Sequence, residues 1–188
     1  MEKVGVTVRD SSSEFFYPKL LEKLKSYPLQ VSKADLFYLY YGELFQTSRE
    51  SFGYISRPEG IAFANAVGRN DCRKTISTGM KLLNYMPVDP TVLLHVNTCM
   101  KAGQEADTTY YLANRFNLLL EAILSTGNGL SKETAIKIVH IEDDKVLKGI
   151  LRFLGGTESL EFGNNTGYSV WRKDNRVLYF EDVWAKSF

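Results

Sequence analysis

The sequence predicts an α+β fold that is mainly α: antiparallel helix pairs followed by a small, mostly antiparallel sheet that carries one helix. The first observation is a change of hydrophobic pattern near residue 128. Before this point apolar residues recur at the spacing of amphipathic helices, and after it short β-branched runs are typical of strands. The second observation is the turn Gly127-Asn128-Gly129, which directly follows the strongly apolar segment 118–124. The chain of 188 residues therefore divides into two dissimilar halves.

We predict three regions: a flexible tail over residues 1–13, a helical repeat-like region over 14–127, and a small α+β region over 130–188. The run Ser11-Ser12-Ser13 favours a tail that leads into a helix start. Because a sheet of this size is rarely stable alone, we expect it to pack on the helical region and to form one cooperative unit with it.

Apolar stripes at helical spacing predict the helices of the first half. The stripes cover residues 16–27, 34–45, 59–67, 72–83, 92–100 and 112–123. Pro28 ends the first helix, and Asn70 is the expected N-cap of the fourth. Segment 47–58 contains Gly53 and is expected to be a long irregular connection. Short helices separated by tight Gly or Pro turns predict antiparallel neighbours.

The spacing of the helices suggests a repeat. Gly68 and Gly103 are separated by close to the roughly 34-residue period of tetratricopeptide repeats. The segment Leu39-Tyr40-Tyr41-Gly42 also resembles the first helix of such a repeat, in which glycine lets the paired helix approach. An irregular helical bundle is the alternative, because positions that are small in the repeat hold larger side chains, at Leu82, Thr108 and Arg115.

The second half predicts a strand, a helix and three further strands. The strand over 134–141 is apolar on both faces, so we expect it to be covered and central in its sheet. The acidic residues 142–144 favour the N-terminus of a helix that ends at Gly155-Gly156. Strands are expected over 157–162, 168–173 and 176–184, with a hairpin turn at Asp174-Asn175.

Composition excludes several classes of function. The 23 basic residues nearly balance the 22 acidic ones, and no Lys/Arg cluster is present, which argues against nucleic acid as a partner. No apolar run is long enough to span a bilayer, so no transmembrane segment is expected. The first residues lack the basic start and apolar core of a signal peptide, which favours the cytoplasm for the chain as written.

Neither a metal nor a cofactor is indicated by the sequence. Cys72 and Cys99 lie on separate predicted helices within apolar stripes, and the simplest interpretation is two buried thiols that act as small hydrophobic side chains. A disulfide requires the two helices to face each other. With only His95 and His140 besides, no zinc-ligand spacing exists.

Two groups of residues are candidates for a functional site. His140 could act as a base oriented by Glu142 or Asp143, but no nucleophile motif accompanies it, and a strand-end histidine beside a solvated helix cap is the favoured interpretation. Adjacent helical residues point about 100° apart, so one tyrosine of each pair 40–41 and 110–111 should face outward. The candidate binding residues, for which core or rim packing is the alternative, are Tyr41, Tyr111 and Arg115.

The segment LLLEAILSTGNGLSKETAIKIVHIEDDKVLKGILRFLGG resembles the core of an uncharacterised bacterial family, domain-of-unknown-function family 4919. The resemblance rests on residues 122–129, 133–135 and 143–154, and extends over roughly 35–183. It implies a repeat-like helical array followed by a short α+β tail, and no known activity. Asn128 stands where an acidic residue is common. Relatives usually carry an export signal, which implies the cell envelope for a chain whose own signal had been removed.

Two classes of function remain. The first is a non-enzymatic scaffold that binds a protein or peptide on the groove of its helix pairs. The second is an enzyme or small-molecule binder with its site at the corner between the helical and α+β halves. An open, aromatic-lined groove favours the first class, and an apolar pocket with converging polar groups at the corner favours the second.

Overall fold

A computed structural model describes residues 1–46, 57–103, 106–140, 142–153, 155–163 and 166–183. Its helices are α1 (Glu2–Arg9), α2 (Tyr17–Ser26), α3 (Lys33–Gly42), α4 (Pro58–Gly68), α5 (Cys72–Leu82), α6 (Pro90–Gly103), α7 (Ala106–Leu124) and α8 (Asp143–Ile150), with short 3-10 turns η1 (Pro28–Gln30) and η2 (Glu43–Phe45). Its strands are β1 (Ile136–Ile138), β2 (Thr157–Gly163), β3 (Thr166–Lys173) and β4 (Arg176–Asp182). The mainly α, α+β class is confirmed. The connection expected over 47–58 lies, up to residue 56, outside the described residues.

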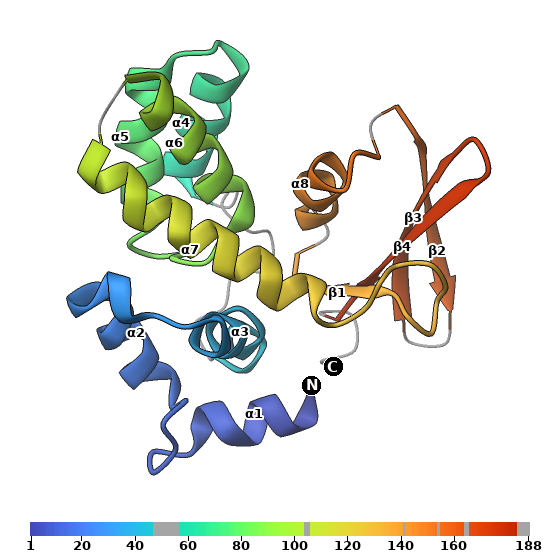
Figure 1. Cartoon of the computed structure of the whole chain (residues 1–188), viewed down its shortest axis with the longest axis horizontal. Coiled ribbons are helices and arrows are strands. Elements are labelled where there is room, and N and C mark those ends of the chain that lie inside the picture. The colour runs from blue at the N-terminus through green and yellow to red at the C-terminus, as the bar shows by residue number, and fades with distance from the viewer. Residues whose placement is uncertain (47–56, 104–105, 141, 154, 164–165, 184–188) are drawn as a thin grey trace.

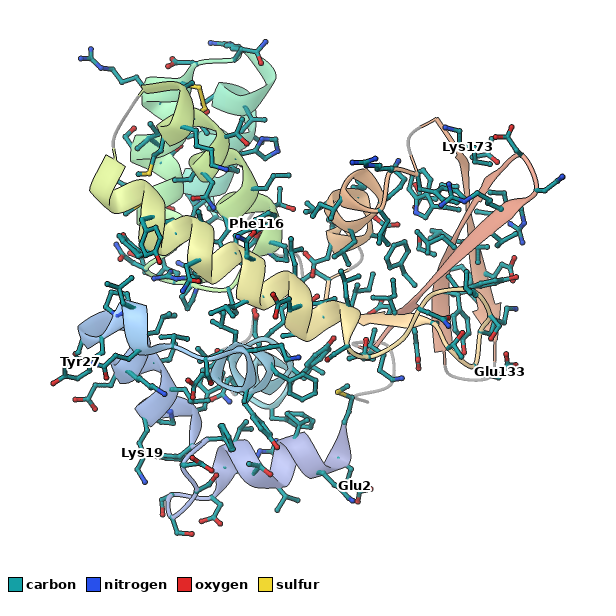
Figure 2. The ribbon with its side chains drawn as sticks, in the orientation of Figure 1. Glu2, Lys19, Tyr27, Phe116, Glu133 and Lys173 are labelled. Atoms are coloured by element: carbon teal, nitrogen blue, oxygen red, sulfur yellow. A yellow bond between two sulfur atoms is a disulfide. The ribbon has the colours of Figure 1, made fainter. Side chains whose placement is uncertain are left out.

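Helix α7 is the central element of the fold. It contacts α6 on one side and α3 on the other, so α4–α6 and α1–α3 lie on opposite sides of it (Figure 1). Figure 2 shows the side chains that fill the space around α7, Phe116 among them. Leu119 and Ile123 are fully buried and Leu120 is nearly so. The strongly apolar end of α7 is therefore covered from more than one direction.

The structure places a helix where the sequence predicts a flexible tail. Helix α1 contacts α3 and η2 and buries Val4 and Val8. Gly42 allows this close approach, because a Cβ at that position would lie 3.0 Å from Val8 and 2.9 Å from the Tyr17 ring. Gly42 thus admits α1, which precedes α3 in the chain, and not the paired helix of a repeat that the sequence predicts. The helix escaped prediction because two buried valines are too few to establish a period.

The N-cap of α5 differs from the expected one. Asp71 caps the helix, since its carboxylate accepts a hydrogen bond of 3.0 Å from the Lys74 backbone N–H. Asn70 instead has a φ of 54°, in the left-handed region that asparagine tolerates better than most residues. The asparagine therefore forms the turn between α4 and α5, and the aspartate one position later begins the helix.

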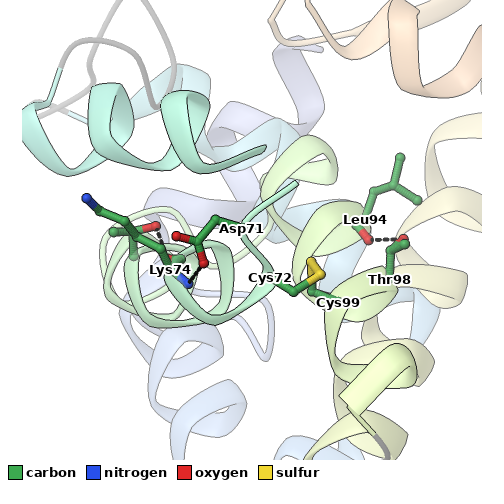
Figure 3. Close-up of a disulfide and its surroundings, with 7 residues drawn as sticks. Asp71, Cys72, Lys74, Leu94, Thr98 and Cys99 are labelled. Atoms are coloured by element: carbon green, nitrogen blue, oxygen red, sulfur yellow. Dashed lines mark hydrogen bonds between the residues drawn. A yellow bond between two sulfur atoms is a disulfide. The ribbon is translucent and has the colours of Figure 1, made fainter. Parts of the chain in front are cut away.

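Cys72 and Cys99 form a disulfide that joins the start of α5 to α6 (Figure 3). Their Cα atoms are 5.0 Å apart. Gly79 lets the two helices lie this close, because a Cβ there would come within 2.3 Å of Val96. The interpretation of two free thiols is therefore wrong: the helices face each other, which the sequence pattern could not establish.

The sheet has the order β1-β4-β3-β2. Strands β2, β3 and β4 pair antiparallel, and β1 pairs parallel to β4 with Ile136 opposite Phe180. The expected mostly antiparallel sheet and the turn at Asp174-Asn175 are confirmed. Helix α8 contacts α6, and Leu147 of α8 belongs to the same buried cluster as Phe180 of β4 and Ile123 of α7. One hydrophobic core thus extends through both halves.

Strand β1 lies at the edge of the sheet, not at its centre as the sequence predicts. On the side of β1 that has no partner strand, side chains of the helical half take the hydrogen bonds. The Lys137 N–H donates to Thr126 Oγ1 at 3.0 Å, and the Lys137 carbonyl accepts from the Tyr41 hydroxyl at 2.8 Å. Ile136 and Ile138 are buried and the strand packs on α7, an arrangement that gives much the same sequence pattern as a central strand.

Candidate functional site

A groove lies between α2 and the segment that follows α5, with α7 lining it as well; we call it the α2–α5 groove. It consists of two adjoining cavities that share Leu21, Lys25, Asn84 and Pro87. The Arg115 cavity, of about 210 Å³, is also lined by Leu24, Pro28, Met80, Leu83, Tyr111, Leu112 and Arg115. The Arg57 cavity, of about 420 Å³, is also lined by Tyr17, Pro18, Glu43, Gln46, Arg57, Tyr85 and Met86.

Arg115 is the most distinctive residue of the groove. It extends from α7, and only 9% of its surface is exposed. Its Nη1 donates to the Pro87 carbonyl at 3.3 Å, and its guanidinium carbon lies 5.6 Å from the centre of the Tyr111 ring. The Nε–H is buried without an acceptor among the described residues. Desolvation by burial lowers the pKa of Arg115, which remains a cation because its ordinary value is so high.

The Arg57 cavity carries charges of both signs. Arg57 lies over the ring of Tyr85, with its guanidinium carbon 4.3 Å from the ring centre. Glu43 lines the same cavity, and its carboxylate oxygen Oε1 lies 3.4 Å from His140 Nε2. The exposed Lys25 belongs to both cavities. The groove therefore combines aromatic, aliphatic and mainly cationic side chains.

A second group of polar residues lies at the corner between the two halves, and all but the partly exposed Glu43 are buried; we call Tyr40, Glu43, Asp89, His140 and Asp143 the corner cluster. The Tyr40 hydroxyl donates to Asp143 Oδ2 and accepts from the Val139 N–H at 2.8 Å. The His140 N–H donates to the same Asp143 oxygen at 3.3 Å. Asp89 caps α6 through a 2.8 Å bond from the Val92 N–H.

The charges of the corner cluster perturb one another. Burial raises the pKa of Asp143 to about 7 and that of Asp89 to about 6, against their ordinary value of 3.8. Burial works to lower the pKa of His140, but its contact with Glu43 and the negative charges of Asp143, Glu43 and Asp89 outweigh burial and raise that pKa to about 9. His140 is therefore protonated near neutral pH, beside two buried carboxyl groups that titrate at or just below that pH.

The geometry of the corner cluster suits a structural contact that holds the two halves together better than it suits a catalytic site. Tyr40, Asp143 and His140 are buried, and of the cluster only Glu43 lines the groove. A general base must come within hydrogen-bond reach of its substrate, and the Tyr40 and Asp143 oxygens already bond one another. The expectation of a solvated helix cap beside His140 is also wrong, since Asp143 and Asp144 are almost fully buried.

Two of the three candidate binding residues lie together, and the third lies elsewhere. Tyr111 and Arg115 line the same cavity, as positions i and i+4 of one helix do when they share a face. Tyr41 is fully buried, and its hydroxyl bonds the Lys137 carbonyl, so it belongs to the interior. Of the second tyrosine pair, Tyr110 faces outward with 68% of its surface exposed.

Sequence reasoning missed the residues on the α2 side of the groove. Leu21 and Lys25, one helical turn apart, line both cavities. Leu21 lies beside the apolar stripe that predicts α2, and the signal that could have found this wall is the position of Pro28, which ends α2 and itself lines the Arg115 cavity. No local signal shows that α2 faces the end of α5, because the two are far apart in sequence.

The fold and groove define a mainly α, α+β protein with a cation-bearing groove among its helices. The chain belongs to the family described as Domain of unknown function (DUF4919), which it matches over residues 2–165. No curated protein and no solved structure matches it. Within the described ranges, no helix is both long and apolar enough to cross a membrane.

Proposed function

We propose that this protein is a non-enzymatic module that binds a protein or peptide in the α2–α5 groove. The observation that carries the proposal is that Tyr111 and Arg115 line one cavity of a groove formed by helix faces. Tyrosine and arginine are the residue types that most often dominate binding energy at protein interfaces. At the corner, by contrast, Tyr40, His140 and Asp143 are buried and bonded to one another.

We also infer that α4–α7 form two tetratricopeptide-like helix pairs. The supporting observations are that α4 ends at Gly68 and α6 at Gly103, and that α4 contacts α5, α5 contacts α6, and α6 contacts α7 in series. Three or more repeats are normally needed for a stable stack. The helices α1–α3 take the place of a further repeat here, since α3 covers the side of α7 that α6 leaves open.

A small-molecule site at the corner is the second candidate function. A cavity of about 420 Å³ beside the turn at residue 128 favours it, although its described lining comes from that turn and the α+β half alone; the lining includes Asn128, Asn175 and Arg176 beside apolar side chains. The Arg176 guanidinium already lies 5.0 Å from the centre of the Phe153 ring. A thermal-shift screen with metabolites on wild type and Arg176→Ala tests this candidate: a metabolite that raises the melting temperature of wild type alone would establish it.

We propose further that the protein works in an oxidising compartment such as the cell envelope. The disulfide between Cys72 and Cys99 supports this, because such bonds are rare where cellular reductants keep thiols free. Alkylation of free thiols in intact cells, before lysis, provides the test. We expect that Cys72 and Cys99 are alkylated only after reduction. Alkylation of both cysteines without reduction would contradict the proposal.

The test of peptide binding uses selection from a random peptide library against the full chain, followed by affinity measurement on variants. Tyr111→Ala should weaken binding of selected peptides by about tenfold or more, the usual cost of losing an important interface residue. Tyr110→Ala is the matched control, since this neighbouring tyrosine is exposed and does not line the groove. Equal effects of the two variants would show that the peptides bind elsewhere, and a library without binders would contradict the proposal.

A further inference from the structure

Arg115 is a buried cation that lacks a counter-ion among the described residues. In the described part of the chain its hydrogen-bond acceptor is the neutral carbonyl of Pro87, and its Nε–H has no acceptor there. Proteins normally pair a buried charge with an opposite charge, since desolvation without such a partner is costly. The guanidinium retains donors that a negatively charged ligand oxygen could use.

The rest of the Arg115 cavity is apolar apart from a few groups. Its aliphatic lining residues are Leu21, Leu24, Met80, Leu83 and Leu112. Among the described residues that line the cavity, the second cation is Lys25 and none is acidic. A complementary ligand therefore has an apolar part and a negatively charged part within the same small space. A phosphate group fits this description poorly, because a dianion without an apolar part would lose its hydration against the leucines.

The size of the cavity narrows the choice further. Its volume of about 210 Å³ is below the roughly 300–1,000 Å³ of sites that hold drug-sized ligands. It suits a single amino-acid residue, and the adjoining Arg57 cavity can receive the residues next to it. Only the last residue of a peptide carries an apolar side chain and a carboxylate on the same Cα atom. An internal aspartate or glutamate has its carboxylate at the end of the side chain that must fill the cavity.

We propose that the Arg115 cavity binds the C-terminal residue of a peptide or protein partner, with an apolar side chain among the leucines and the terminal carboxylate at the Arg115 guanidinium. This inference rests on the proposed function, because it assigns an end and a chemistry to the ligand of the same groove. Lys25 adds positive charge at the point where the two cavities join. The preceding residues of the partner extend into the Arg57 cavity.

The test compares peptides of identical sequence in two forms, a free C-terminal acid and a C-terminal amide, on arrays probed with the full wild-type chain. The free acids that bind should end in Leu, Ile, Met, Val or Phe, and their amides should bind about 10- to 100-fold more weakly, the range expected for loss of a charge-assisted hydrogen bond. This comparison changes only the ligand, so it does not depend on a variant that must fold.

Protein variants then identify the residue that senses the carboxylate. Arg115→Gln should bind the free acid and the amide equally. Arg73 is an exposed arginine outside the groove, so Arg73→Gln should prefer the free acid as wild type does. Arg115→Lys should retain part of the preference, because it keeps the charge.

Four outcomes would overturn the inference. Equal binding of acid and amide in a Tyr111-dependent manner would leave a peptide groove without a carboxylate subsite. Amides that bind through an internal Asp or Glu, or acids that inorganic phosphate displaces as readily as a matching free acid does, would assign the anion to another source. An array without any binder would refute the peptide-binding function itself, and this inference with it.

Discussion

The substitution Tyr40→Phe removes one oxygen atom from the contact between the two halves. The hydroxyl donates to the Asp143 carboxylate and accepts from the Val139 N–H, two residues of the α+β half, while Tyr40 itself belongs to α3. A hydrogen bond to a charged group contributes about 1.5–3 kcal/mol and a neutral one about 1 kcal/mol. We therefore expect Tyr40→Phe to lower the free energy of unfolding by about 2–4 kcal/mol.

Two other tyrosines calibrate this effect. Tyr41→Phe keeps the same ring in the core and loses one neutral bond, from its hydroxyl to the Lys137 carbonyl, so it should cost about 0.5–1.5 kcal/mol. Tyr110→Phe changes an exposed hydroxyl and should alter stability by less than about 0.5 kcal/mol. The three variants make the same chemical change in three environments.

Urea unfolding provides the assay, with far-ultraviolet circular dichroism to follow the helices and tryptophan fluorescence to follow the second half, which contains both tryptophans. Both signals should move together to lower urea in Tyr40→Phe. A loss of unfolding free energy no larger than that of Tyr41→Phe would refute the role of the corner cluster in holding the two halves together. Separate transitions of the two signals in wild type would refute the single cooperative unit.

Further perturbations test other parts of the structure. Reduction of the Cys72–Cys99 disulfide, which closes a separation of 27 residues, should cost about 3–4 kcal/mol; dithiothreitol should lower the melting temperature of wild type and leave Cys72→Ser/Cys99→Ser unchanged. The pKa of His140 is raised from 6.5 to about 9, so its charge stabilises the fold fully below pH 6.5 and that stability is lost as the pH rises through 9. The difference in unfolding free energy between wild type and His140→Gln should accordingly shrink over this interval, and a difference that grows with pH would contradict the assignment. Finally, a fragment that ends at Gly129 should bind a hydrophobic dye, because the end of α7 loses its contact with β1; a monomeric fragment with an unchanged sharp melt would show that the halves are independent.

Local patterns predicted most of the elements because their causes are local. The apolar stripe of α7 and the hairpin at Asp174-Asn175 depend on residues within a few positions of one another. These features needed no knowledge of which distant segments meet.

What the sequence did not predict depends on distant partners. Tyr40 and Asp143 are 103 positions apart, so nothing near Asp143 shows that it is buried. The edge position of β1 also depends on other segments. The backbone groups of Lys137 that have no partner strand are hydrogen-bonded by the side chains of Thr126 and Tyr41. The disulfide likewise required α5 and α6 to be placed in space.

The sequence singled out residues on only one of the two walls of the candidate groove. Tyr111 and Arg115 share one helix, so their residue types and spacing could be assessed together. The opposite wall, with Leu21 and Lys25, comes from another part of the chain and is brought to the groove only by the packing of α1–α3 on α7. Residue type thus identified one wall, and tertiary structure supplied the other.

Position-specific photo-crosslinking tests the central claim, that the α2–α5 groove is the binding surface, most directly. A benzoylphenylalanine placed at Asn84, which is exposed and lines both cavities, is compared with one at Tyr110, exposed on α7 outside the groove. With a library-selected peptide as probe, the residue at position 84 should crosslink and the one at position 110 should not, and unlabelled peptide should abolish the product. Crosslinking at position 110, or at both positions equally, would contradict the assignment of the groove.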